Sequence, residues 1–113
     1  MREIIPRLAI VIPCYNEELC IESTVGKLSE VLSSLIDKGK ISDDSYMYLV
    51  DDGSSDSTWS IIEKLHDTNN FVKAVKFIKN FGNQKAIIAG YEGVHDLGCD
   101  CAVSIDADLQ QDE

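Results

Sequence analysis

Apolar runs alternate with amphipathic stretches along this chain, and the alternation restricts the fold more than any other feature. Three short apolar runs, at residues 8–12, 46–50 and 102–105, and the stretch 72–78, which also contains two lysines, are typical of strands. The three segments between them carry apolar residues three or four positions apart, the spacing of one helix face. Such alternation requires right-handed crossovers and a parallel sheet. We expect an α/β fold, a Rossmann-like three-layer α/β/α sandwich with a mostly parallel sheet of order 3-2-1-4.

Polar loops follow several of these runs directly. In a doubly wound sheet, ligands bind at the carboxyl ends of the strands, where the direction of winding reverses. Under the expected strand order, residues 13–17 and 106–110 lie at that point, and residues 51–55 lie one strand away. Three polar loops at one crevice indicate a binding site more strongly than any single loop.

The most informative loop contains Asp106 and Asp108. Alternate residues of an extended segment face the same way, so both carboxylates and Gln110 are expected to point into one space. Two carboxylates about 4 Å apart repel by roughly 4 kcal/mol at an effective dielectric of 20, which calls for a proton, a basic side chain or a divalent cation. No Lys or Arg lies between Lys85 and Glu113. Oxygen ligands suit Mg²⁺ or Mn²⁺, although a solvated turn explains the pair alone equally well.

Composition excludes several classes of function. The 113 residues suffice for one domain and include 20 acidic and 10 basic side chains, for a net charge of −10, which argues against a nucleic-acid partner. The sequence has neither the glycine pattern of a dinucleotide site nor a P-loop, so phosphates must be held mainly by a metal. The N-terminal residues lack the apolar core of a signal peptide, and the segment is expected to be soluble.

The four cysteines, Cys14, Cys20, Cys99 and Cys101, form no C-x-x-C pair. A zinc site is therefore not expected, and we interpret them as reduced, partly buried thiols of a cytosolic protein.

Two side chains in the first two loops suit a nucleotide. Tyr15 can lie against a base or sugar, and Asp52 can accept hydrogen bonds from a base edge. Considered singly, a packed aromatic ring and a helix-capping acid are the simpler interpretations of these residues.

Four segments taken together resemble the motifs of family 2 glycosyltransferases. Residues 11–18 look like the first-strand motif, residues 50–58 like the second, and residues 80–86 with Ala89-Gly90 like the third. Residues 106–110 match the Asp-x-Asp metal motif. All occur in family order at strand ends, and the most similar members look like dolichol-phosphate mannose synthases and bacterial undecaprenyl-phosphate glucosyltransferases.

The sequence also departs from the family pattern at two places. Lys79 stands where Arg is common, and residues 111–113 stand where the family has an Asp-Pro-Pro-like continuation.

The resemblance implies a GT-A fold that binds a nucleotide-diphospho-sugar. By the family pattern, Pro13, Tyr15 and Glu17 line the nucleoside pocket. Val50, through its backbone, and Asp52 are expected to hold the base.

The same resemblance assigns the diphosphate and metal to the last motif. Asp106, Ala107, Asp108 and Gln110 are expected to gather round them. The metal ligands would be Asp106, Asp108 and Gln110, with Asp108 and Gln110 the most direct, and the cofactor Mg²⁺ or Mn²⁺.

The implied reaction transfers a hexose with inversion to an acceptor, which we expect to be a polyprenyl phosphate. A phosphate acceptor is already anionic and needs no general base. The family places the acceptor-side groups beyond Glu113, so no catalytic residue is assigned, and the uncovered edge of the last run agrees with a missing half. We interpret residues 1–113 as the N-terminal, donor-binding portion of a larger catalytic domain. Alone, this portion should bind nucleotide weakly and catalyse no sugar transfer.

The resemblance extends to the cellular setting. In the full-length protein we expect a location in the cytoplasm, at the cytoplasmic face of the membrane, with a role in the cell wall. The sequence leaves open whether the protein forms a homo-oligomer.

Two other functions compete with this one. A phosphohydrolase of the haloacid dehalogenase type also has an Asp-x-Asp loop, with the first Asp as nucleophile. That loop normally follows the first strand, whereas here it follows the fourth, with Leu109 where Thr or Val is expected. The other alternative is a non-catalytic nucleotide-binding fragment or interaction module.

Overall fold

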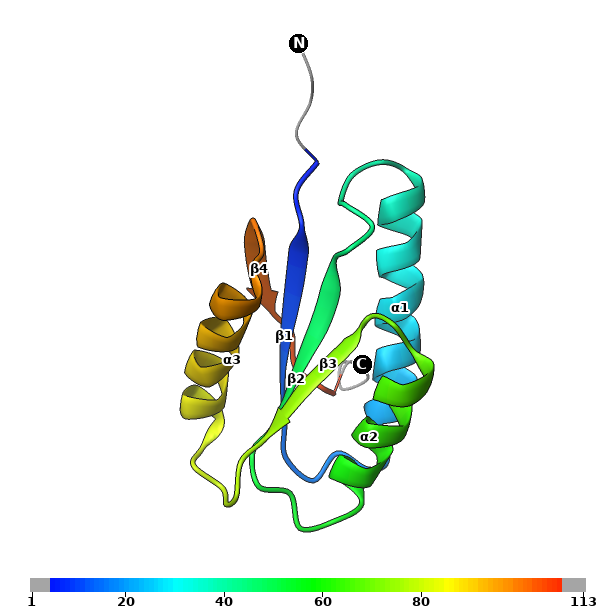
Figure 1. Cartoon of the computed structure of the whole chain (residues 1–113). Coiled ribbons are helices and arrows are strands. Elements are labelled where there is room, and N and C mark those ends of the chain that lie inside the picture. The colour runs from blue at the N-terminus through cyan, green and yellow to red at the C-terminus, as the bar shows by residue number, and fades with distance from the viewer. Residues whose placement is uncertain (1–4, 109–113) are drawn as a thin grey trace.

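Strands and helices alternate throughout residues 5–108, the part of the chain that this computed structural model describes (Figure 1). The alternation predicted from the apolar runs is confirmed. In chain order the elements are β1 (Leu8–Cys14), α1 (Ile21–Asp37), β2 (Tyr46–Asp51), α2 (Thr58–Thr68), β3 (Val72–Lys76), α3 (Asn83–Leu97) and β4 (Cys101–Ser104).

The four strands form one parallel sheet in the order β3-β2-β1-β4, as predicted. The central strand β1 pairs with β2 from Ala9 opposite Tyr46 onward, and with β4 from Leu8 opposite Cys101. Helices α1 and α2 pack against each other on one face of the sheet, and α3 packs on β1 and β2 from the other face (Figure 1). This three-layer arrangement brings the carboxyl ends of all four strands to one edge.

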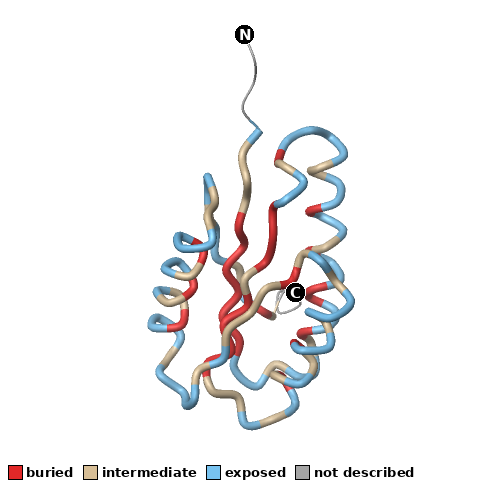
Figure 2. The backbone as a smooth tube through the Cα atoms, in the orientation of Figure 1, coloured by how far each residue is buried: buried red, intermediate tan, exposed pale blue. Residues whose placement is uncertain are grey.

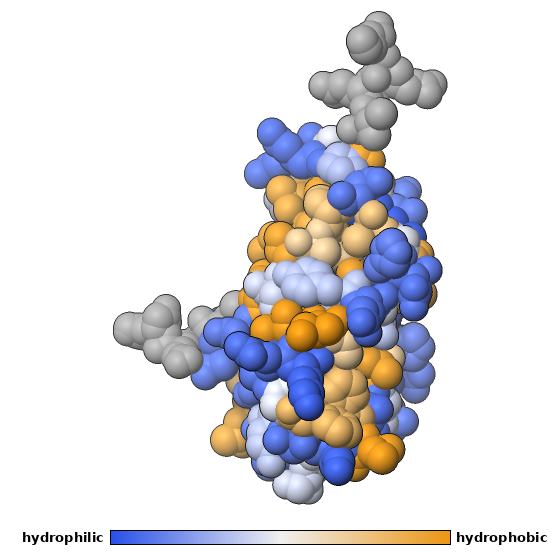
Figure 3. All heavy atoms as spheres, turned by 90° about the vertical axis from the view of Figure 1, so that its left-hand side faces the viewer, coloured by the Kyte–Doolittle hydropathy of each residue, from blue (hydrophilic) through white to orange (hydrophobic). Residues whose placement is uncertain are grey.

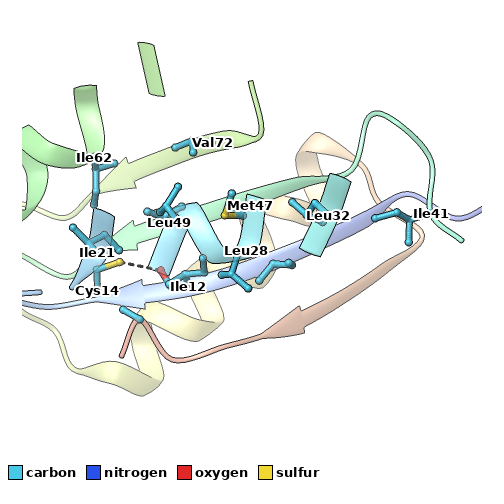
Figure 4. Close-up of a cluster of buried hydrophobic side chains, with 13 residues drawn as sticks. Ile12, Cys14, Ile21, Leu28, Leu32, Ile41, Met47, Leu49, Ile62 and Val72 are labelled. Atoms are coloured by element: carbon cyan, nitrogen blue, oxygen red, sulfur yellow. Dashed lines mark hydrogen bonds between the residues drawn. The ribbon is translucent and has the colours of Figure 1, made fainter. Parts of the chain in front are cut away.

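Both faces of β1 are buried, which explains its uninterrupted apolar sequence (Figure 2). Ile10, Ile12 and Cys14 join the larger core cluster, under α1 and α2. Ala9 and Val11 join the smaller cluster, under α3. In the larger cluster the Cys14 thiol donates a hydrogen bond to the Ile12 carbonyl at 3.4 Å (Figure 4). Alternation along one strand therefore ties the two helical layers to the same central element.

Helix α3 lies close to the sheet at Gly90. A Cβ atom on Gly90 would press into Val11 Cγ1 and lie 3.3 Å from Val50 Cγ2. The absence of a side chain at this buried position sets the separation between α3 and strands β1 and β2.

Strand β4 differs from the buried strand that its apolar sequence predicts. Within residues 5–108 it has a neighbour on one side only, and three of its four residues are exposed. Apolar side chains of β4 and α3, among them Val103, Leu97 and Ile88, are exposed, and Figure 3 shows apolar surface on this side of the molecule. An apolar run predicts a strand, but its burial depends on partners that the run does not specify.

The third strand is shorter than the stretch that predicted it. β3 ends at Lys76, and Ile78, the last residue of the strand expected over 72–78, is 93% exposed. No helix within residues 5–108 combines the length and the apolar character that a membrane crossing requires.

Candidate functional site

Three loops meet at the carboxyl edge of the sheet and enclose a hollow of about 270 Å³. The loops are residues 15–20, 52–57 and 77–82, and they follow β1, β2 and β3. Four residues predicted to contact a nucleoside are among those that line the hollow. The lining residues are Pro13, Cys14, Tyr15, Glu17, Asp52, Asn80, Gly82 and Asn83.

Val50 is the predicted nucleoside residue that does not line the hollow. Its side chain is buried on β2 under α3, and its backbone lies opposite Pro13 in the parallel ladder. This placement agrees with a role for its backbone alone. The backbone continues to the hollow at Asp52, whose N–H donates to the Cys14 carbonyl at 2.8 Å.

Asp52 holds the loop between β3 and α3. Its Oδ1 accepts a hydrogen bond from the Phe81 N–H at 2.7 Å, and its Oδ2 accepts from the Gly82 N–H and the Asn80 Nδ2 amide, both at 3.0 Å. Asp52 is therefore not the capping acid of α2, whose N-cap is Ser57. A carboxylate offers about four acceptor positions, and three of those of Asp52, which is 1% exposed, are used by these donors.

Gly53 allows the second and third loops to touch. Its φ of +73° lies in the left-handed region, and a Cβ atom there would collide with the backbone of Lys79 and Asn80. The glycine after Asp52 thus lets the β2–α2 backbone pass close to the loop that Asp52 binds.

The first and second loops are joined by reciprocal hydrogen bonds. Asn16 N–H donates to Ser54 Oγ at 2.8 Å, and Ser55 N–H donates to Asn16 Oδ1 at 2.9 Å. Glu17 N–H donates to Thr58 Oγ1 at 2.8 Å. Together these bonds hold the backbone that carries Tyr15 and Glu17.

Asn16 is of a residue type that often caps helices, but it does not cap α1. The helix begins at Ile21, and Asn16 adopts a φ of +53°, a conformation that asparagine tolerates better than most residues. Its side chain serves the neighbouring loop instead.

A buried acid, Asp51, lies beneath this junction. It is fully buried at the end of β2, and its Oδ1 accepts a hydrogen bond from Ser54 Oγ at 2.5 Å. Within residues 5–108 its Oδ2 has no hydrogen-bond partner. Burial raises the pKa of Asp51, and the Ser54 hydrogen bonds and the Lys76 charge only partly oppose this.

Replacing Asp51 with Asn should stabilise the chain near neutral pH by about 1 kcal/mol, because it removes a buried, incompletely paired charge. An acid whose folded-state pKa is raised gives the most stability below its unfolded pKa. That stability is lost as the pH rises through the folded-state pKa. Urea unfolding from pH 4 to pH 8 should therefore show the advantage of Asp51→Asn growing with pH. Asp43→Asn, at an exposed site, is the control, and a difference that does not change with pH would contradict this account.

The carboxylates of the last motif flank a buried residue. Asp106 is exposed and Asp108 is half-buried, whereas Ala107 between them is 2% exposed and packs in the larger core cluster. The chain bends at Ala107, so the expected extended course of this segment does not continue past the strand. Gln110, the third predicted metal ligand, lies outside the described residues. Among residues 5–108, no group of three or more His, Cys, Asp and Glu side chains is arranged to hold a metal ion.

The surroundings of the carboxylates are negatively charged. Burial raises the pKa of the Cys20 thiol to about 11, with a hydrogen bond to Glu17 and the charges of Glu17 and Asp108 adding to the effect. The donor set of Asp106 and Asp108 consists of hard oxygens, which fit a divalent cation that keeps several of its waters.

Sequence comparison identifies what this chain is similar to. The sequence model described as Glycosyl transferase family 2 matches residues 9–113. The uncharacterized glycosyltransferase YkoT of Bacillus subtilis is 43% identical over 99% of this chain and 33% of its own length. An undecaprenyl-phosphate 4-deoxy-4-formamido-L-arabinose transferase of Photorhabdus laumondii is 35% identical over 96% of this chain and 31% of its own. The chain thus spans about a third of the length of these curated relatives.

Solved structures share the fold. A mannosyltransferase, PcManGT of Pyrobaculum calidifontis, solved with GDP-Man and Mn²⁺, matches with a TM-score of 0.73 at 22% identity, over 93% of this chain and 28% of its own. TarS of S. aureus, residues 1–349 with UDP, matches with a TM-score of 0.66 at 20% identity, over 90% of this chain and 27% of its own. The fold is therefore the predicted GT-A type, and the family match argues against the phosphohydrolase alternative.

Proposed function

The chain belongs to glycosyl transferase family 2, and on this premise we propose that it is the nucleotide-sugar-binding portion of a longer enzyme. That enzyme would transfer a hexose from a nucleotide-diphospho-sugar to a polyprenyl phosphate. The acceptor class rests on the likeness to the undecaprenyl-phosphate transferases, and the donor class on the likeness to proteins solved with GDP-Man or UDP. The same proposal includes a location of the full-length enzyme at the cytoplasmic face of a membrane and a role in cell-wall assembly.

The observation that carries the proposal is the hollow beside Asp52. Pro13, Tyr15, Glu17 and Asp52, which the family pattern assigns to the nucleoside, come from the end of β1 and from the loops after β1 and β2, and they line a single concave surface. Tyr15 is 45% exposed at its rim, where a ring can lie against a base or sugar. Asp52 is the expected acceptor for a base N–H, and the N–H groups that it binds prevent its carboxylate from rotating away.

The residues after β4 would handle the diphosphate. Asp106 and Asp108, with Gln110, would hold Mg²⁺ or Mn²⁺, which would neutralise the charge that develops on the departing nucleoside diphosphate. The carboxylates themselves repel phosphate oxygens, so they orient the donor only when their charge is balanced. A phosphate acceptor attacking from the opposite face would invert the anomeric centre without a general base.

Nucleotide titration tests this function. We expect GDP or UDP to bind the chain in calorimetry, and Mn²⁺ to raise the affinity by at least about tenfold. Asp108→Asn should remove the effect of Mn²⁺ while leaving metal-free nucleotide binding in place. Asp43→Asn, which removes the same charge at an exposed position, should behave like the wild type.

A folded chain that binds neither nucleotide would contradict the proposal, and equal affinity with and without Mn²⁺ would contradict the metal role. We also propose that the 113-residue chain transfers no sugar by itself. Measurable transfer from a labelled nucleotide-sugar would refute that part.

A further inference from the structure

A buried hydroxyl on α1 reaches the segment that carries the two carboxylates. Thr24 is fully buried, and its Oγ1 donates a hydrogen bond of 2.6 Å to the carbonyl of Ala107, 83 residues away. The Cys20 thiol, one helical turn earlier, lies 3.6 Å from the same carbonyl. Threonine in a helix commonly bonds to the carbonyl four residues before it. Thr24 instead joins the start of α1 to the end of the described chain.

This contact follows the last backbone bond of the sheet. β4 ends at Ser104, and Ile105 N–H donates to the Val11 carbonyl at 3.0 Å. Beyond Ile105, the chain is held by the buried methyl group of Ala107 and by the hydrogen bonds that its carbonyl accepts, a short one from Thr24 and a longer one from the Cys20 thiol. These contacts point Ala107 inward, so Asp106 and Asp108 are left on the outer side.

The position of Ala107 matters because the chain bends at this residue, which is buried between an exposed and a half-buried carboxylate. A slip of one residue would turn a carboxylate into the core and Ala107 toward the crevice. The carbonyl of a specific residue is a more exacting anchor than a small methyl group, because a hydrogen bond has a preferred distance and direction.

We propose that Thr24 is a positioning residue for the cation-binding carboxylates Asp106 and Asp108. Thr24 touches neither the cation nor the nucleotide, and it acts by fixing the backbone between the two acids. This inference rests on the proposed function, because it assumes that the carboxylates bind Mg²⁺ or Mn²⁺.

The test replaces Thr24 with Val, which keeps the shape and loses the hydroxyl, and with Ser, which keeps the hydroxyl. Free Mn²⁺ measured by electron paramagnetic resonance gives the affinity of each chain. We expect Thr24→Val to weaken Mn²⁺ binding by about tenfold or more, the usual loss when a residue that orients a metal ligand is removed. Thr24→Ser should restore it, and GDP or UDP binding without metal should not change. Thr68→Val is the matched control, because within the described part of the chain the Thr68 hydroxyl bonds only locally, to the Lys64 carbonyl of α2.

A second measurement needs no metal. Amide hydrogen exchange of the metal-free chain should become faster at residues 105–108 in Thr24→Val, with the β1–β2 ladder unchanged. If Thr24→Val folds poorly by circular dichroism, Thr24→Ala replaces it in both measurements with the same expected results.

The outcomes separate the two proposals. Unchanged exchange at residues 105–108, or faster exchange with an unchanged Mn²⁺ affinity, overturns the role of Thr24 and leaves the proposed function standing. A loss of Mn²⁺ affinity that Ser does not restore also overturns it. A wild-type chain that binds no Mn²⁺ contradicts the proposed metal role itself, and the inference falls with it.

Discussion

Replacing Asp52 with Ala is expected to lower the free energy of unfolding by about 3 kcal/mol, because three donors lose a charged acceptor at once. The N–H groups of Phe81 and Gly82 and the amide of Asn80 all point at this buried carboxylate. Without it, the N–H groups of Phe81 and Gly82 are left unpaired or the loop before α3 moves toward solvent, whereas the Asn80 amide keeps its 3.1 Å hydrogen bond to the Asp52 backbone carbonyl. Urea unfolding followed by circular dichroism measures the loss.

The same substitution should abolish detectable nucleotide binding, since it removes the predicted base acceptor and releases one wall of the hollow. Asp52→Asn should lie between Ala and wild type in stability, because its amide keeps one acceptor oxygen but turns an NH₂ group toward the donors. Asp43→Ala, at an exposed position, is the control. An unfolding free energy for Asp52→Ala within about 0.5 kcal/mol of that control would mean that other contacts hold the loop.

Replacing two helical glycines with alanine is expected to change the free energy of unfolding in opposite directions. Gly90→Ala should cost about 2 kcal/mol, because the added methyl group presses into Val11 Cγ1 and α3 must move off the sheet. Gly26→Ala should gain about 1 kcal/mol, because Gly26 is exposed on α1 and a Cβ there meets nothing within 4 Å.

The pair isolates packing from helix propensity, since both changes add the same methyl group to a helix interior. Thermal or urea unfolding of the two variants should differ by about 3 kcal/mol. If both were stabilised, the contact of α3 with β1 would be looser than described. A destabilised Gly90→Ala with unchanged Asp52 interactions would also show that α3 can shift without disturbing the loop before it.

The architecture could be predicted because it follows from patterns within single elements. The buried run of β1, its end after Pro13 and the helical spacing of the intervening segments each depend on local sequence. The order β3-β2-β1-β4 then follows from the limited set of connections open to alternating strands and helices. The edge position of β4 follows from the same order and was expected, whereas the exposure of its side chains depends on what packs against the strand.

The contacts between loops were harder to predict from the sequence. Asn16 has the residue type of an N-cap, and nothing in the neighbouring sequence reveals that its side chain binds Ser55, 39 residues away. Asp52 was predicted as an acceptor, but its partners Asn80, Phe81 and Gly82 belong to another loop. Such contacts depend on the distance between strand ends, which exists only once the sheet has formed.

The bonds between Asn16, Ser54 and Ser55 have a consequence for ligand entry. Loops that fluctuate independently must lose conformational entropy when a small molecule orders them, which weakens affinity. Here the first two loops restrain each other through their own hydrogen bonds. Asn16→Ala would break that restraint. It should therefore lower the affinity of any ligand that binds in the hollow, although no direct contact to the ligand is removed.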